Sequence, residues 1–164
     1  MEIKVTERAT IRTATQEDID RVEATLRAGD RAECEIFGDK SAYHAKVSEF
    51  EQCWAIFGRG ELVGYCGVLI APGTTALAPT RWLCFLSTES VDKMKISFVR
   101  DSRAVMKAIV ERTPEHVKLF YSMPMSSYHG SIIWHERILK MKRSSVVMVN
   151  GHEHTLYTIE RKEI

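Results

Sequence analysis

The sequence of 164 residues lacks the marks of several large protein classes. No apolar run approaches the length of a membrane span, and the first residues contain no apolar core of a secretory leader. There is no Walker-type phosphate loop, no G-x-S-x-G elbow and no dinucleotide-binding fingerprint. These absences argue against those classes and favour a protein that is made and kept in a cytoplasm.

Cysteine is scarce, and no pair of cysteines has the spacing of metal ligands. Three of the four lie in strand-like runs, where a thiol behaves as a small buried hydrophobe. His152 and His154 alternate along an expected strand and share one face, but no third ligand is evident. We therefore expect no metal site and reduced, structural thiols. The four cysteines are Cys34, Cys53, Cys66 and Cys84.

An excess of charge of one sign is also missing. Lysine and arginine (23) nearly balance aspartate and glutamate (22), so the net charge is +1, which argues against a dedicated nucleic-acid binder. Hydrophobic residues make up 45% of the chain and charged residues 27%, as in ordinary globular proteins. Without internal repeats or linkers, residues 1–164 are expected to form one domain with a substantial core.

The N-terminal segment predicts a strand that leads directly into a helix. The strand includes Ile11, and Thr15 is placed to cap the helix, with Asp18 three residues later. Apolar residues then repeat at helical spacing as far as Leu26, and Gly29 is expected to end the helix.

The rest of the pattern predicts a mixed α/β domain, with a splayed sheet of about six or seven strands flanked by helices. Asn150-Gly151 is a preferred type I′ turn, and the residue before Pro114 disfavours helix. We expect one or two short polar helices within 30–50, strands at 53–57 and 61–70 joined by a turn at 58–60, a strand at 81–86, a helix from 91 to 109, a strand at 117–121, a helix from Ser126 or Ser127 to about Met141, and a hairpin of 146–149 with 154–159.

This order of elements resembles that of the GNAT N-acetyltransferases, from about residue 9 to residue 161. The strand–cap–helix entry at 11–19 and the hairpin that ends in Glu61-Leu62-Val63-Gly64 carry the resemblance. It implies the GNAT fold, acetyl-CoA as a cofactor, and transfer of an acetyl group to an amine.

Two segments are similar to the small internal virion (core) protein family of T7-like phages. They are Cys84 to Val91, followed by a basic helix, and Ser127 to Ile159. The similarity implies a phage protein in the host cytoplasm or associated with the virion. A phage or host protein is then the expected partner, with a small amine as an alternative substrate, and neither nucleic acid nor membrane is expected.

The chain departs from the GNAT pattern where active enzymes carry a glycine-rich loop for the pyrophosphate of coenzyme A. Glycines there let backbone amides approach the phosphates, but residues 92–103 contain none. The apolar spacing continues through this segment and predicts that helix replaces the loop. The alternative is a helix that begins after a bend and is capped by Ser97 or Ser102, which would restore a helix terminus that binds anions.

Side chains can substitute for the missing amides, because cations bind phosphate. The resemblance implies a cofactor site at Leu86 and Ser87 with the cations Lys95, Arg100 and Arg103. The alternative is that these cations form a solvated basic face of a helix.

The second family motif, Asn-x-x-Ala-x-x-x-Tyr, is also absent in strict form. The reaction needs a base for the attacking amine and an acid for the leaving thiolate. His129 or Glu136 is a candidate base, and Tyr128 or Tyr121 a candidate acid. Two hypotheses stay open: an acyl-CoA-dependent N-acetyltransferase with an atypical phosphate site, and a non-catalytic phage protein that uses the same scaffold for virion assembly or partner binding.

Overall fold

A computed structural model of the chain describes residues 2–36 and 45–164. Within these residues one eight-stranded sheet forms, in the order β1-β2-β3-β4-β5-β6-β8-β7. Neighbouring strands are antiparallel except β5 and β6, which run parallel. The strands are β1 (Ile3–Lys4), β2 (Ala9–Thr13), β3 (Gln52–Gly58), β4 (Glu61–Ile70), β5 (Thr80–Ser87), β6 (Leu119–Ser122), β7 (Lys142–Val149) and β8 (His152–Glu160).

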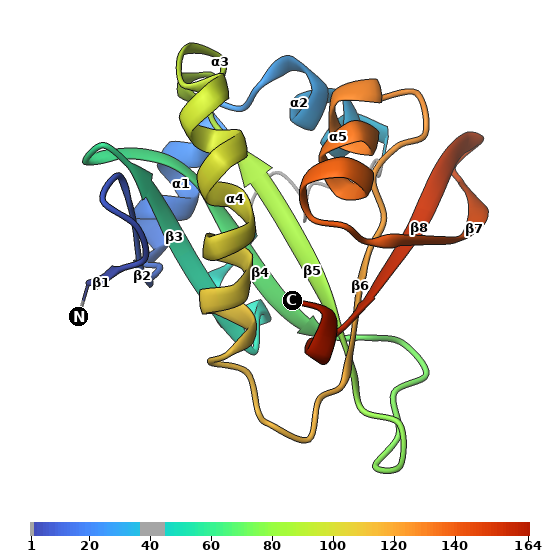
Figure 1. The fold of residues 1–164 in the computed structure, drawn as a ribbon. Coiled ribbons are helices and arrows are strands. Elements are labelled where there is room, and N and C mark those ends of the chain that lie inside the picture. The colour runs from blue at the N-terminus through green and yellow to red at the C-terminus, as the bar shows by residue number, and fades with distance from the viewer. Residues whose placement is uncertain (1, 37–44) are drawn as a thin grey trace.

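Helices cover both faces of the sheet (Figure 1). In the view of Figure 1, α4 crosses in front of the sheet and α1 lies behind it. Each face has its own buried cluster: α4 packs on one side with Val105, Met106 and Ile109, and α1 on the other with Ile19 and Val22. The helices are α1 (Gln16–Ala24), α2 (Ala28–Ile36), η2 (Val47–Glu49), α3 (Ser90–Lys93), α4 (Lys95–Val110), α5 (His129–Ile133), the π-helix η3 (Trp134–Ile138) and η4 (Arg161–Glu163).

The N-terminus of α1 confirms the predicted cap. The Thr15 hydroxyl accepts from the Asp18 amide, and the Asp18 carboxylate accepts from the Thr15 amide, which forms a reciprocal capping box. The predicted end of the helix is wrong. It stops at Ala24, and Gly29 lies inside α2, where the ring of Tyr128 covers its Cα.

The two predicted hairpins are confirmed. Arg59 and Gly60 both have positive φ (52° and 82°), as do Asn150 and Gly151 (48° and 80°), which is the pattern of a type I′ turn. No sequence pattern predicts β1, which pairs with β2 through two residues. The polar helix expected within 30–50 is present in part as α2 and η2, and residues 37–44 of that segment lie outside the described residues.

Two predicted helices differ from the structure. The helix expected from 91 to 109 is interrupted at Met94, which separates α3 from α4. Neither Ser97 nor Ser102 caps it, because both hydroxyls donate to carbonyls one turn back, at Met94 and Phe98. The later helix begins at His129, and neither Ser126 nor Ser127 precedes it as a cap.

The cysteines are free thiols, three of them buried. Cys53, Cys66 and Cys84 lie in β3, β4 and β5 as expected, and Cys34 lies in α2. Burial raises the pKa of the Cys34, Cys53 and Cys84 thiols to about 12, so they stay protonated and unreactive. None of the described helices combines the length and apolar character of a membrane span.

Candidate functional site between the diverging strands

The parallel strands β5 and β6 stay together only briefly. They pair from Thr80 with Leu119 to Trp82 with Tyr121. Beyond this point β5 continues to Ser87, bonded to β4 along its other edge, while β6 ends at Ser122. The edge of β5 after Trp82 therefore faces an opening in the sheet, with backbone groups that no described strand covers.

A cleft of about 1030 Å³ occupies this opening. Its walls come from both faces of the sheet, because it contacts Phe98 and Trp134 on the α4 side as well as Tyr65 and Cys34 on the α1 side. The cleft therefore passes through the plane of the sheet, with one mouth beside α4 and α5 and the other beside α2.

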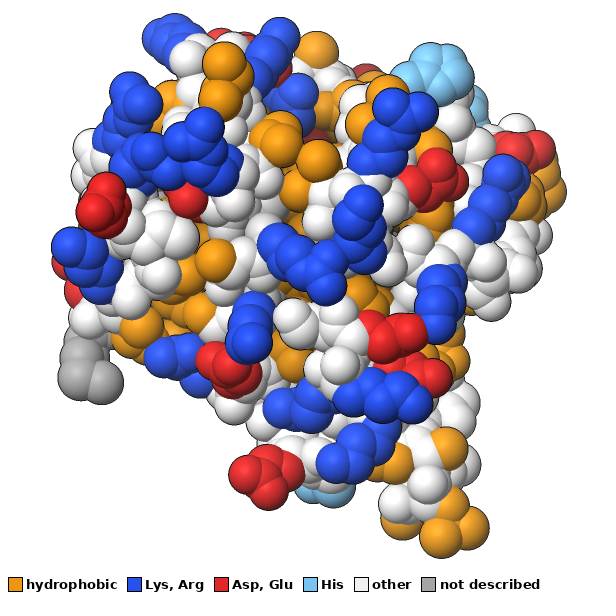
Figure 2. Space-filling model, in the orientation of Figure 1, with side chains coloured by type: hydrophobic (Ala, Val, Ile, Leu, Met, Phe, Trp, Pro, Cys, Tyr) orange, Lys and Arg blue, Asp and Glu red, His pale blue; other side chains and the backbone are white. Residues whose placement is uncertain are grey.

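The mouth between α4 and α5 is apolar. Trp134 packs edge-on against Phe85, with centroids 5.0 Å apart, and stacks on Phe98 at 6.0 Å. Val99 and Ile133 extend the apolar wall and are exposed. Figure 2 shows hydrophobic side chains in the hollow between these two helices, with lysine and arginine side chains around it.

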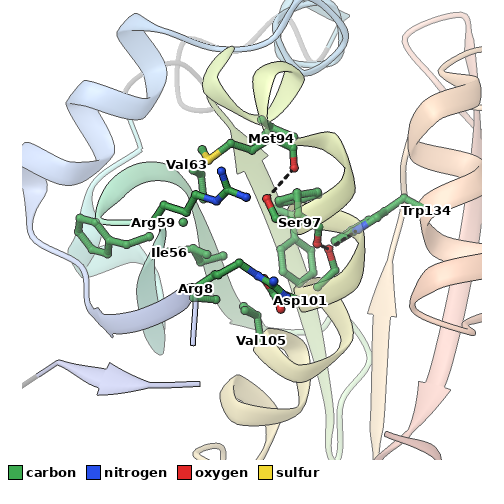
Figure 3. A pocket seen from close by; sticks show the side chains of 16 residues that line it. Arg8, Ile56, Arg59, Val63, Met94, Ser97, Asp101, Val105 and Trp134 are labelled. Atoms are coloured by element: carbon green, nitrogen blue, oxygen red, sulfur yellow. Dashed lines mark hydrogen bonds and ion pairs between the residues drawn. The ribbon is translucent and has the colours of Figure 1, made fainter. Parts of the chain in front are cut away.

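A smaller hollow of about 50 Å³ adjoins this mouth beneath the start of α4. It shares Phe98 and Trp134 with the cleft. In Figure 3 Arg59 points across it toward α4, and Arg8 faces Asp101, 3.4 Å away. Met94, where the chain bends before α4, lines this hollow.

The N-terminus of α4 is open. Met94 precedes the helix with no side-chain cap hydrogen bond, and the first turn holds no acidic residue. The first amides of a helix have no partner within it, and the helix dipole makes this end positive. Lys95, which lines the cleft, adds a cation. The arrangement attracts an anion although the segment has no glycine.

The opposite mouth is acidic. Asp30 accepts from the Ser87 amide at 2.9 Å and from the Ser87 hydroxyl at 2.5 Å, and burial raises its pKa. Glu33 accepts from the Met125 amide at 2.5 Å, and burial raises its pKa to about 7. A carboxyl with this pKa exchanges protons near neutral pH, which suits a general base.

Tyr128 closes the same mouth. A Cβ at Gly29 would lie 2.1 Å from Cζ of Tyr128, so the ring rests directly on the backbone of α2. The Arg27 guanidinium lies 6.0 Å from the ring centroid. Burial raises the pKa of Tyr128 to about 12, so its hydroxyl is protonated at neutral pH and can donate.

The structure brings some of the predicted site residues together and leaves others apart. Leu86, Ser87, Lys95 and Tyr128 line the cleft. The rest lie outside its lining: Arg103 donates to the Glu163 carbonyl at 2.8 Å, Glu136 accepts from the Tyr157 hydroxyl at 2.7 Å, and Arg100 and His129 are exposed. Tyr121 stacks on Trp82 at 6.2 Å, below the opening.

Sequence reasoning missed several polar residues of the cleft, among them two carboxylates and a serine–histidine pair. Asp30 and Glu33 lie in a segment whose pattern indicated only a polar helix. Ser122 and His135 also line it and contact each other, although 13 residues separate them. No spacing rule joins residues that meet only through the fold.

Solved structures of acetyltransferases share this fold. A probable acetyltransferase superposes with a TM-score of 0.69 at 14% identity, covering 100% of this chain and 99% of the other. The aminoglycoside acetyltransferase AAC(6')-Ib, in complex with coenzyme A, gives 0.68 at 16% identity, over 94% and 95%. An acetyltransferase from Salmonella typhimurium that modifies the N-terminal serine of ribosomal protein L7/L12 gives 0.67 at 13%, over 98% and 99%.

No model of a protein family matches the sequence, and neither does any curated protein. At the identities above, the structural likeness shows the fold. The described chain forms a single α/β domain of the GNAT fold, as predicted.

Proposed function

We propose that the protein is an acyl-CoA-dependent N-acyltransferase that acts on a cationic amine. The observation that carries this proposal is the cleft through the sheet, with an open helix N-terminus at one mouth and two carboxyls of raised pKa at the other. Similar folds have been solved with coenzyme A bound.

The residues at the α4 mouth fit the donor. The uncapped start of α4 and Lys95 suit the phosphates. The free edge of β5 offers backbone groups to an amide-bearing arm, and Phe98 with Trp134 offers an apolar wall. Acetyl-CoA would supply an activated thioester there.

The residues at the α2 mouth fit the acceptor. Asp30 and Glu33 attract an ammonium group, and Glu33, with its pKa of about 7, takes the proton that the amine must lose before it attacks. Tyr128 keeps its proton at neutral pH and serves as the donor to the leaving thiolate. His129 and Glu136, the bases predicted from the sequence, do not belong to this proposal, because neither side chain lines the cleft.

One observation favours the second candidate, a non-catalytic phage-type protein that binds a phage or host protein in the host cytoplasm or the virion. Ile96, in the first turn of α4, is 78% exposed, and Val99 is 41% exposed. Exposed apolar side chains where phosphates would lie suit a protein surface better than a nucleotide.

Acetyl-CoA binding separates the two candidates. We expect saturating acetyl-CoA to raise the melting temperature by roughly 5–10 °C, as a ligand at a hundred times its Kd stabilises by about 2.7 kcal/mol. Acetylation of a diamine or a lysine-bearing peptide would then be measured by release of free thiol. Absence of a shift with both acetyl-CoA and coenzyme A would refute the enzyme and leave the partner-binding protein.

A further inference from the structure

The cleft contains a serine–histidine pair that the mechanism above does not use. The Ser122 hydroxyl oxygen lies 2.8 Å from Nε2 of His135, and Nδ1 of His135 lies 2.7 Å from the Ser131 carbonyl oxygen. Both side chains line the cleft, and both residues are otherwise buried, at 5% and 3% exposed. The hydroxyl is therefore approached through the cleft.

The partners of the imidazole assign its protons. A carbonyl oxygen can only accept, so Nδ1 carries the hydrogen and donates it to Ser131. Nε2 then holds the lone pair and accepts from the Ser122 hydroxyl. Burial lowers the pKa of His135 to about 4, so the ring is neutral at physiological pH. This is the state in which a histidine can remove a proton from serine.

The imidazole is held firmly in this orientation. It stacks on Tyr157 with centroids 5.2 Å apart and meets Trp134 edge-on at 5.1 Å. It also lies in the π-helix η3, where the Leu139 amide donates to the Trp134 carbonyl. Wide π turns are uncommon and occur often at functional sites. Here the turn directs His135 toward β6.

The position of Ser122 places its hydroxyl near the start of the opening. It is the residue after Tyr121, which makes the last pair between β6 and β5. Across the cleft lies the edge of β5 beyond Trp82, which no described strand covers. The Ser87 amide at the end of this edge donates to Asp30, so donors to a developing oxyanion would come from the residues between Trp82 and Ser87.

We propose that Ser122 is a nucleophile that takes the acyl group from an acyl thioester, with His135 as its base. The Ser122 oxygen forms a bond to the acyl carbon, the carbon–sulfur bond breaks, and the hydroxyl proton passes through Nε2 to the thiolate, which leaves as a thiol. Water then attacks the serine ester, gives its proton to Nε2, and releases the carboxylic acid as the proton returns to Ser122. Without an amine, the protein is a slow thioesterase.

This proposal rests on the proposed function only for the identity of the donor, acyl-CoA. A buried hydroxyl bonded to a neutral imidazole also satisfies two polar groups, which is a structural role. The test must therefore detect the acyl-serine bond itself.

The experiment incubates the protein with acetyl-CoA, and separately with p-nitrophenyl acetate, in the absence of amine. Acid-quenched samples are analysed by intact mass and peptide mapping, and thiol or nitrophenol release is followed with time. The variants are Ser122→Ala, Ser122→Cys and His135→Gln. Ser127→Ala, at an exposed serine five residues along the chain, is the matched control.

We expect one acetyl group on the peptide that contains Ser122, and at least a hundredfold slower release in Ser122→Ala and His135→Gln. Ser122→Cys should trap a thioester, which keeps the test valid if the alanine variant does not fold. Ser127→Ala should behave as the parent. Acetylation elsewhere, or unchanged release from Ser122→Ala, overturns the proposal.

The two reagents separate this proposal from the proposed function. If p-nitrophenyl acetate labels Ser122 while acetyl-CoA neither binds nor reacts, the nucleophile stands and the acyl-CoA donor is refuted. If acetyl-CoA binds and supports amine acetylation but neither reagent labels Ser122, the nucleophile is refuted and direct transfer stands.

Discussion

Two helix N-termini in this fold are built in opposite ways. The start of α1 is sealed: Thr15 and Asp18 satisfy each other's amides, and the Arg12 guanidinium binds both oxygens of Asp18 at 2.7 Å. The start of α4 has Met94 in the capping position and a lysine as its first residue. One helix end is completed by the chain itself, and the other is left with its positive potential unmatched.

The difference shows which end has a structural task. A carboxylate in the first turn stabilises a helix, so an uncapped, lysine-bearing start costs stability. This loss of stability occurs at the mouth of the cleft, where a bound anion would offset it. The sealed end of α1 supports the fold, and the open end of α4 is available for binding.

The largest loss of stability should follow from removing the capping carboxylate at the start of α1. Burial raises the pKa of Asp18, but hydrogen bonds from Arg12 and Thr15 outweigh it and lower the pKa below its ordinary value. Asp18→Asn removes the charge that these donors meet, and we expect a loss of about 2 kcal/mol in urea unfolding. The control is Asp20→Asn, on the exposed face of α1, for which we expect a loss of unfolding free energy under about 0.5 kcal/mol. Equal losses would contradict the special role of the capping carboxylate.

Glu33 carries the opposite shift and should give the opposite pH dependence. Its pKa is about 7 in the folded protein against an ordinary 4.5, so its stabilising contribution is complete below pH 4.5 and is lost as the pH rises through 7. Glu33→Gln does not titrate, so relative to the parent it should gain up to about 3 kcal/mol between pH 4.5 and pH 8, at about 1.4 kcal/mol for each unit of difference between the two pKa values. Urea unfolding of the parent and the variant at several pH values measures this difference. A difference in unfolding free energy that does not change with pH would refute the raised pKa of Glu33.

Reversing the charge at the open end should separate stability from binding. Lys95→Glu supplies the missing first-turn acid, so we expect unchanged or slightly higher stability, by up to about 1 kcal/mol, and about tenfold weaker acetyl-CoA binding in calorimetry. Lys107→Glu, in the last turn of the same helix, is the matched control. It should lose a few tenths of a kcal/mol and bind normally. Weaker binding in both variants would indicate a general charge effect.

The smallest effect is expected at Arg103, which the sequence indicated as a phosphate ligand. Its guanidinium donates to the Glu163 carbonyl instead. Arg103→Ala should leave acetyl-CoA affinity within about twofold and cost at most about 1 kcal/mol of stability. Calorimetry and urea unfolding of the same sample test both. A tenfold loss of affinity would place the phosphates along α4 rather than at its start.

Much of the fold could be predicted from the sequence, because the residues that determine its turns and caps are close together in the chain. The Asn150-Gly151 turn and the Thr15 cap each depend on residues a few positions apart, and both are confirmed. The failures arise where a contact between distant residues overrides a local signal. Gly29 indicated a helix end, yet its missing side chain makes room for Tyr128, which is 99 positions later and invisible to any periodicity.

Less of the candidate site could be predicted, because its polar groups come from segments that are far apart in the sequence. Lys95 was found through its charge in a glycine-free segment, but Arg100 and Arg103 carried the same signal and lie outside the cleft lining. Glu33 meets the Met125 amide 92 positions away. Its burial and raised pKa follow from that distant contact.

The contact between Gly29 and Tyr128 ties the backbone of α2 to the position of a distant hydroxyl. A Cβ at position 29 would lie 2.1 Å from Cζ of Tyr128, the carbon that carries the hydroxyl, so an alanine there must displace the ring from α2. Because Tyr128 is the proton donor in the function proposed for the cleft, the absence of one methyl group at Gly29 determines where that proton is held. Gly29 therefore acts on the chemistry through a ring that lies 99 positions later in the chain.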